Sequence, residues 1–262
     1  MQCTILASGS KGNCLLIEGS DGDLLIDVGL SAKETLLRIA RAGKKPDNIR
    51  AILVTHEHGD HIAGVDVLSR RLNIPIYATE GTLYDFMNYR RISEHSIDIH
   101  TCKYHEKVNI ENFIIEPFAT SHDANEPCGF YIKENGIRFG CCTDTGIITD
   151  RILAIFQRCD GVVLESNHCP VMLKNGPYPE SLKRRIRSAR GHLSNEAASR
   201  CVRTLAKDVH KFVLAHLSEV NNTPDKARAG ARDGLGLLYD ETTLIIATQS
   251  GTSEVCPQVL QL

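Results

Sequence analysis

Long apolar runs, a secretion signal and net charge are all missing or small in this sequence. No stretch of about 18 apolar residues occurs in it, and a membrane-spanning helix needs roughly that many. The N-terminus has no basic segment followed by an apolar stretch, so we expect no signal peptide. With 42% hydrophobic and 24% charged residues, the composition is typical of a folded globular chain. We therefore expect a cytoplasmic protein with no membrane partner.

Paired cysteines are also missing, although the chain contains ten cysteines. They are scattered along the sequence, Cys141 and Cys142 are adjacent, and none forms a C-x-x-C pair. Disulfide frameworks and zinc ribbons need regularly spaced cysteines, so neither is expected. In a reducing compartment these thiols should be free.

The net charge is only −2, which argues against a protein that coats nucleic acid through its overall field. A polyanionic substrate would have to be held locally. The one dense basic stretch is residues 183–190, with five cations in eight residues and no acid. On its own, such a stretch is also typical of a solvated helix face.

The order of apolar runs and turn residues predicts an α/β protein. We predict strands at residues 4–7, 14–18, 23–27, 51–55, 74–78, 97–101, 107–110, 113–118, 128–133, 137–142, 161–165, 211–215 and 243–247. We predict helices from a Ser31 cap to about Gly43 and at residues 65–72, 178–188, 195–206 and 224–237. Two β-rich blocks, each accompanied by helices, favour a four-layer αββα sandwich over a doubly wound sheet. Without a repeat or a linker, we expect residues 1–262 to form a single domain.

The sharpest motif is His56-Glu57-His58-Gly59-Asp60-His61, directly after the apolar strand predicted at 51–55. Three imidazoles and a carboxylate within six residues can supply nitrogen and oxygen ligands to more than one metal ion. Gly59 lets the backbone bend within the motif. A solvated histidine-rich loop would not explain this position at the end of a buried strand, where loops commonly carry sites.

These residues resemble the metallo-β-lactamase superfamily, whose signature H-x-H-x-D-H they match in full. The resemblance continues along the chain with three residues that each follow a predicted strand: His122, Asp144 and His216. It implies the metallo-β-lactamase fold and two divalent metal ions, Zn²⁺ or Mn²⁺. The implied ligands are His56, His58 and His122 for one ion, Asp60, His61 and His216 for the other, and Asp144 for both. Asp27 would support this site from behind.

Within the superfamily, the chain is most similar to the bacterial group called YycJ, WalJ or VicX. The similar segments are residues 6–10 with Gly12-Asn13, 55–61, 165–168, 191–195 and 215–222. This group implies a 5′→3′ exonuclease-like activity, with DNA rather than RNA as the expected partner. The roles of Asn167 and His168, and the choice between a monomer and a homodimer, stay open.

His192 is the predicted general acid. Two metal ions can activate a bridging water and neutralise charge on a phosphodiester, but they supply no proton for the leaving oxygen. His192 lies just before the helix predicted to begin at Ser194 and Asn195, whose free amides would face an anion. Its segment also resembles a histidine and helix in the tRNA-processing ribonuclease Z branch, where the histidine assists leaving-group departure. A helix-capping histidine is the alternative. We predict His192 and Asp60 as the catalytic residues.

The basic stretch ends two residues before His192, and this position suggests a function for it. We predict that it binds neighbouring phosphates together with the helix start, through Lys183, Arg184, Arg187, Arg190, Ser194 and Asn195. The predicted protein is thus a binuclear metal-dependent phosphodiesterase or nuclease that uses a metal-bridging hydroxide as nucleophile. Three alternatives stay open: a small-molecule phosphodiesterase, a thioester or lactone hydrolase with an apolar acyl pocket, and a non-catalytic metal-stabilised binding module.

Overall fold

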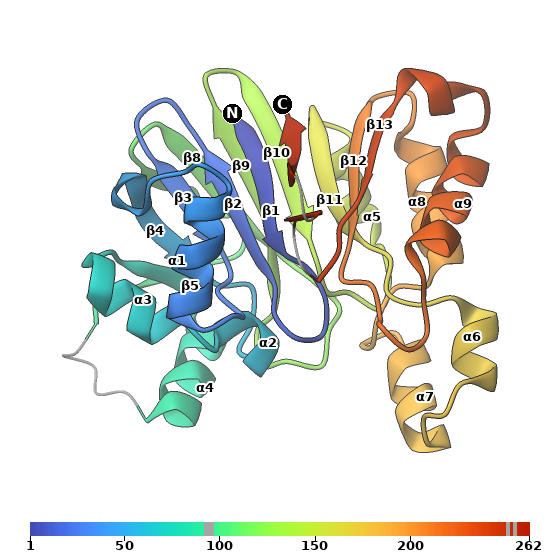
Figure 1. The fold of residues 1–262 in the computed structure, drawn as a ribbon, viewed down its shortest axis with the longest axis horizontal. Coiled ribbons are helices and arrows are strands. Elements are labelled where there is room, and N and C mark those ends of the chain that lie inside the picture. The colour runs from blue at the N-terminus through green and yellow to red at the C-terminus, as the bar shows by residue number, and fades with distance from the viewer. Residues whose placement is uncertain (92–96, 250–251, 254–255) are drawn as a thin grey trace.

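Two β-sheets lie face to face in the computed structural model, with helices on the outer face of each (Figure 1). The structure describes residues 1–91, 97–249, 252–253 and 256–262. Its four layers are helices, sheet, sheet and helices, which confirms the predicted αββα sandwich. None of the helices in these ranges is long and apolar enough to cross a membrane.

The first sheet is antiparallel on one side and parallel on the other. In spatial order its strands are β14 (Thr252–Ser253), β15 (Cys256–Gln261), β1 (Gln2–Ala7), β2 (Cys14–Glu18), β3 (Asp23–Ile26), β4 (Ile49–Leu53), β5 (Ile76–Thr79) and β6 (Ile99–Cys102). The strands from β14 to β3 run antiparallel, and those from β3 to β6 run parallel. The register pairs Gln2 with Gln261, so the two ends of the chain lie side by side.

The second sheet is also mixed, with parallel strands on one side and antiparallel strands on the other. In spatial order its strands are β13 (Thr243–Ile246), β12 (Lys211–Ala215), β11 (Gly161–Glu165), β10 (Ile137–Cys142), β9 (Cys128–Glu134), β8 (Phe113–Ala119) and β7 (Val108–Ile110). The strands from β13 to β10 run parallel, and those from β10 to β7 run antiparallel. The carboxyl ends of β8, β10, β11 and β12 therefore point to the same edge of the sandwich.

The helices cover the outer faces or stand at that edge. Those next to the first sheet are α1 (Ala32–Arg41), α2 (Gly59–Ile62), α3 (Val65–Leu72) and α4 (Glu80–Arg90), with the 3₁₀ turn Pro46–Asn48. Those next to the second sheet are α5 (Asp150–Phe156), α6 (Pro170–Asn175), α7 (Glu180–Arg187), α8 (Asn195–Leu205) and α9 (Pro224–Leu235), with the 3₁₀ segment Gly236–Glu241. As predicted, Ser31 caps α1, where its side chain accepts a hydrogen bond from the Glu34 amide.

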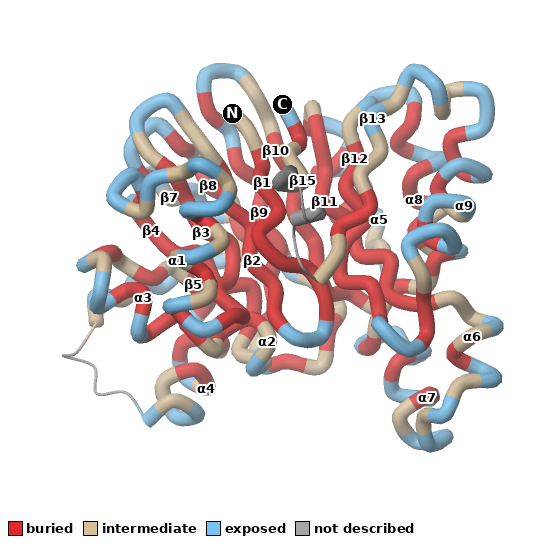
Figure 2. Tube along the Cα trace, in the orientation of Figure 1, coloured by how far each residue is buried: buried red, intermediate tan, exposed pale blue. Residues whose placement is uncertain are grey.

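The core is divided by the two sheets into three apolar clusters. Neighbouring residues of β11 show how one strand serves two of them, because successive side chains point to opposite faces. Val163 belongs to the cluster between the sheets, whereas Val162 and Leu164 pack with the outer helices of the second sheet. A third cluster joins the first sheet to α1, α3 and α4. Figure 2 shows the resulting buried interior, with exposed residues on the outer helices and loops.

Candidate metal centre

The H-x-H-x-D-H motif spans the loop after β4 and the start of α2, at the lower edge of the sandwich in Figure 1. His56 and His61 are buried, and His58 and Asp60 are half-buried. Helix α2 begins at Gly59, so Asp60 and His61 lie in its single turn. The turn thereby directs four potential ligands to the edge where β8, β10, β11 and β12 also end.

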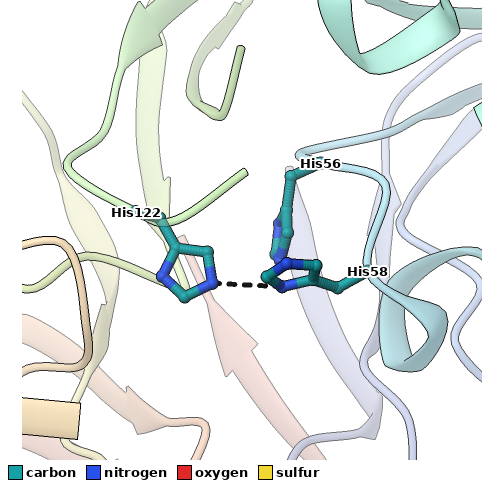
Figure 3. Close-up of side chains that lie close together, drawn as sticks. All are labelled: His56, His58 and His122. Atoms are coloured by element: carbon teal, nitrogen blue, oxygen red, sulfur yellow. Dashed lines mark hydrogen bonds between the residues drawn. The ribbon is translucent and has the colours of Figure 1, made fainter. Parts of the chain in front are cut away.

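Three histidines converge at this edge (Figure 3). One imidazole nitrogen each of His56, His58 and His122 lies within 4.8 Å of the others. His122 Nε2 is 3.2 Å from His58 Nδ1, while His122 Nδ1 lies 2.9 Å from the Gly191 carbonyl oxygen and donates to it. This donation fixes the ring so that its other nitrogen faces the histidine group.

A second group lies beside the first and contains a carboxylate. One ligand atom each of Asp60, His61 and His216 again lies within 4.8 Å of the others. His216 Nε2 is 3.5 Å and His61 Nε2 is 3.7 Å from Asp60 Oδ2. These are the six residues that the sequence predicts as two ligand triads, and the structure brings each triad together.

Asp144 lies between the two groups. Its Oδ2 is 3.3 Å from His61 Nε2, and its Oδ1 is 3.9 Å from His122 Nε2 and 2.9 Å from His216 Nδ1. The carboxylate is buried in the loop after β10. One carboxylate therefore faces members of both triads, as a bridging ligand must.

The unpartnered atoms of this edge fit divalent cations. His56 Nε2, Asp144 Oδ2 and His216 Nε2 are buried and have no hydrogen-bond partner among the described residues. Buried polar atoms without a partner are costly, and a cation among them would remove that cost. Imidazole nitrogen and carboxylate oxygen are ligands of Zn²⁺ and Mn²⁺. The residues present thus fit a divalent metal site.

The pKa values of the potential ligands are also compatible with metal binding. Burial raises the pKa of Asp144, but His216 and His61 outweigh burial and hold it well below its usual range. Burial, followed by His61, lowers the pKa of His56 well below its usual value, so its imidazole is neutral. Burial lowers the pKa of His61 too, yet Asp144 and Asp27 raise it to about 9. A metal ion at His61 would therefore bind in exchange for a proton.

Two buried acids orient the ligands from behind. Asp27 Oδ2 accepts a hydrogen bond from His61 Nδ1 at 2.7 Å, in the supporting position that the sequence predicts. Glu165, at the end of β11, was not predicted. Its Oε1 accepts from His192 Nδ1 at 2.7 Å and from His216 Nδ1 at 3.0 Å. An acid that ends an otherwise apolar strand, Gly161–Glu165, is the sequence signal that could have found it.

His192 lies beside both triads. Its ring centroid is 5.0 Å from that of His122 and 5.2 Å from that of His216. Its side chain keeps 21% of its surface exposed and lines a cleft of about 420 Å³. The other lining residues are Ser10, His58, Gly59, Asp60, Asp123, Asp144, Asn167, Tyr178, Leu182, Arg185, Ile186, Gly191, His216 and Ser218.

The cations of the basic stretch, four on α7 and Arg190 after it, lie in different surroundings. Arg185, which was not among the predicted phosphate ligands, lines the cleft. Arg184 and Arg187 are exposed but do not line it. Lys183 is buried and donates to the Lys174 carbonyl oxygen at 2.9 Å. Arg190 donates to the carbonyl oxygens of His122 and Ala124.

The helix start predicted to bind phosphate has internal partners instead. Ser194 caps α8 by accepting from the Ala197 amide, and Asn195 is buried, where its Oδ1 accepts from Ser166 and Asn222. Neither side chain lines the cleft. Asn167 does line it, and donates to the His216 carbonyl oxygen. Ser194 and Asn195 therefore brace the loop around His192.

Known proteins resemble the chain over most of its length. A sequence model described as "Beta-lactamase superfamily domain" matches residues 23–217. The chain is 39% identical to Exodeoxyribonuclease WalJ of Streptococcus pneumoniae over 226 residues, 86% of this chain and 84% of that protein. It is 37% identical to Exodeoxyribonuclease YycJ of Bacillus anthracis over 226 residues, 86% of this chain and 85% of that protein. Among solved structures, the metallo-β-lactamase fold protein YhfI of Bacillus subtilis matches 99% of both chains with a TM-score of 0.75 and 16% identity.

Proposed function

We propose that this chain, which belongs to the β-lactamase superfamily and is a metal-dependent hydrolase, is an exonuclease that removes nucleotides from DNA in the 5′→3′ direction. The observation that carries the proposal is the pair of ligand triads that share Asp144 beside one cleft. The names of the relatives WalJ and YycJ support DNA as the substrate.

Two divalent ions, Zn²⁺ or Mn²⁺, are proposed as the cofactors. His56, His58 and His122 would hold one, Asp60, His61 and His216 the other, and Asp144 both. When bound, such a pair lowers the pKa of a shared water and neutralises charge on a phosphodiester. Asp27 accepts from His61 Nδ1 and would keep Nε2 of that ring turned toward an ion. Glu165 accepts from His216 Nδ1, which leaves His216 Nε2 directed toward Asp60.

The chain itself supplies the proton for the leaving oxygen. Glu165 accepts from His192 Nδ1, so Nε2 is the nitrogen left to face a substrate. Burial lowers the pKa of His192, but Glu165 outweighs it and raises the pKa above its usual value. A protonated imidazole beside the two triads is the arrangement that a general acid requires.

A direct comparison of substrates tests the proposed reaction. With Zn²⁺ or Mn²⁺ added, the protein should hydrolyse bis-p-nitrophenyl phosphate and release mononucleotides from linear DNA labelled at its 5′ end. Closed circular single strands, which offer no end, should stay intact. Turnover of p-nitrophenyl esters or thioesters without phosphodiester cleavage would identify an acyl hydrolase. Cleavage of bis-p-nitrophenyl phosphate alone would identify a small-molecule phosphodiesterase, and equal cutting of circles would identify an endonuclease.

Arg184 and Arg187 remain proposed contacts for the DNA backbone. Both are exposed on α7, whereas Lys183, Arg190, Ser194 and Asn195 have internal partners. Arg187 forms a 3.7 Å ion pair with the exposed Glu180, and such exposed pairs are weak. A DNA phosphate can therefore displace Glu180 from Arg187.

Replacing Arg184 and Arg187 together by alanine should weaken binding of single-stranded DNA. Its log–log salt slope should flatten by about 1.4, because each contact contributes about 0.7. Hydrolysis of bis-p-nitrophenyl phosphate should stay the same, and Arg203→Ala on the exposed face of α8 is the matched control. An unchanged slope in the double variant would mean that these arginines form only a solvated helix face.

A further inference from the structure

Helix α7 and the loop that precedes it form one wall of the cleft. Figure 1 shows this segment with α6 beside the lower end of the second sheet. Four residues of this segment line the cleft: Tyr178, Leu182, Arg185 and Ile186. Leu182 lies three residues before Arg185 and four before Ile186, which places these three on one face of α7, and Tyr178 lies just before the helix begins. The wall is thus aromatic and apolar with a single cation, in contrast to the histidines and carboxylates opposite.

The wall is held rigidly. Tyr178 stands between Pro177 and Pro179, which restrict the backbone on both sides of it. Lys183 joins α7 to α6 through its hydrogen bond to the Lys174 carbonyl oxygen. Gly176 packs so closely on Asn221 that a Cβ there would lie 2.5 Å from Asn221 Oδ1. The backbone that carries Tyr178 at the cleft is therefore restrained.

Arg185 adds a cation beside the metal ligands. Its Nε donates to Asp123 Oδ2, next in sequence to His122, and its side chain remains 57% exposed. No other lysine or arginine is among the described lining residues. The Nη groups are left for another anion, and a planar guanidinium suits phosphate oxygens.

The size of the cleft limits what can enter. At about 420 Å³, it lies at the small end of the range of about 300–1,000 Å³ seen for small-molecule sites. That volume suits one nucleotide rather than a duplex. Nucleobases stack on aromatic side chains irrespective of their identity, and Leu182 and Ile186 extend the apolar surface beside Tyr178.

We propose that Tyr178, Leu182 and Ile186 form the subsite for the base of the terminal nucleotide, and that Arg185 contacts its phosphate. This inference rests on the proposed exonuclease function. It makes Tyr178 a specificity-determining residue that recognises the presence of a base, and not its identity, at the end to be cleaved.

The test measures variants of Tyr178 on two substrates, one with a normal and one with an abasic terminal nucleotide. Tyr178→Ala should lower kcat/KM about ten- to a hundredfold on a strand with a normal terminal nucleotide. On a strand whose terminal residue is abasic, the parent should already show this loss, and the variant should add little to it. Tyr178→Phe should retain the parent's values, and Tyr84→Ala, which removes an exposed tyrosine of α4, is the control. Arg185→Gln should lower kcat/KM by a similar factor on both strands.

Binding provides a readout that does not depend on turnover. Strands whose terminal linkage is a non-cleavable phosphonate should show the same pattern in their Kd for the metal-loaded protein. Equal losses of Tyr178→Ala on normal and abasic ends would make Tyr178 a structural brace and overturn the subsite. No loss on any strand would also overturn it. Failure of the exonuclease function itself would be seen separately, as a parent protein that releases no nucleotide from either strand.

Discussion

Replacing His192 by alanine is expected to slow DNA hydrolysis by about 10²–10⁴, the usual effect of losing a general acid. The metal content should not change, because His192 belongs to neither predicted ligand triad and its Nδ1 is held by Glu165 at 2.7 Å. Metal analysis and single-turnover rates on the same preparations measure both effects. His210→Ala, which removes an exposed histidine, is the matched control.

Substrates with different leaving groups distinguish a general-acid role of His192 from a role in phosphate binding. Nitrophenolate departs with little protonation, so His192→Ala should hydrolyse bis-p-nitrophenyl phosphate far better, relative to the parent, than it hydrolyses DNA. Glu165→Gln should show a milder form of the same pattern, since the amide can still accept from His192 but no longer stabilises its proton. Equal losses on both substrates would assign His192 to binding of the phosphate.

The convergence of the seven proposed metal ligands could be predicted because the sequence signals for these residues are local. Four of the seven predicted ligands lie within six consecutive residues, and the others follow strands that can be recognised from apolar runs. Several strand bounds agree fully with the structure, for example Ile137–Cys142, Gly161–Glu165 and Lys211–Ala215. The strand before the motif was predicted at 51–55 but is observed at Ile49–Leu53. It ends earlier because Thr55 donates its amide to the Asp27 carboxylate.

The features that sequence reasoning missed depend on distant partners. Helix α4 buries Leu83 and Phe86 against the first sheet but exposes Tyr84 and Tyr89, so its apolar and aromatic residues do not mark a single face in the sequence. The pairing of β15 with β1 joins the two ends of the chain and leaves no local pattern. The sequence does not distinguish the cations of the basic stretch, but in the structure Lys183 is buried and Arg185 lines the cleft. Only the packing of α7 distinguishes them.

Asp144 carries the largest expected effect, because its carboxylate is the one group proposed to bind both ions. Its Oδ2 lies 3.3 Å from His61 Nε2 and its Oδ1 3.9 Å from His122 Nε2. Without it, the two triads lose their common anion, and the site loses the charge that offsets two dications. Hydrolysis of DNA and of bis-p-nitrophenyl phosphate should both fall by more than about 10³. Asp144→Asn preserves the shape, and Asp208→Ala removes an exposed acid as the control.

The number of metal ions bound per chain, measured for the parent and for Asp144→Ala with turnover on the same samples, tests the central claim most directly. The account predicts about two Zn²⁺ or Mn²⁺ ions in the parent, and fewer ions with almost no turnover in the variant. Circular dichroism would show that the variant is folded. A folded Asp144→Ala protein that keeps two ions and hydrolyses DNA at the parent's rate would contradict the account.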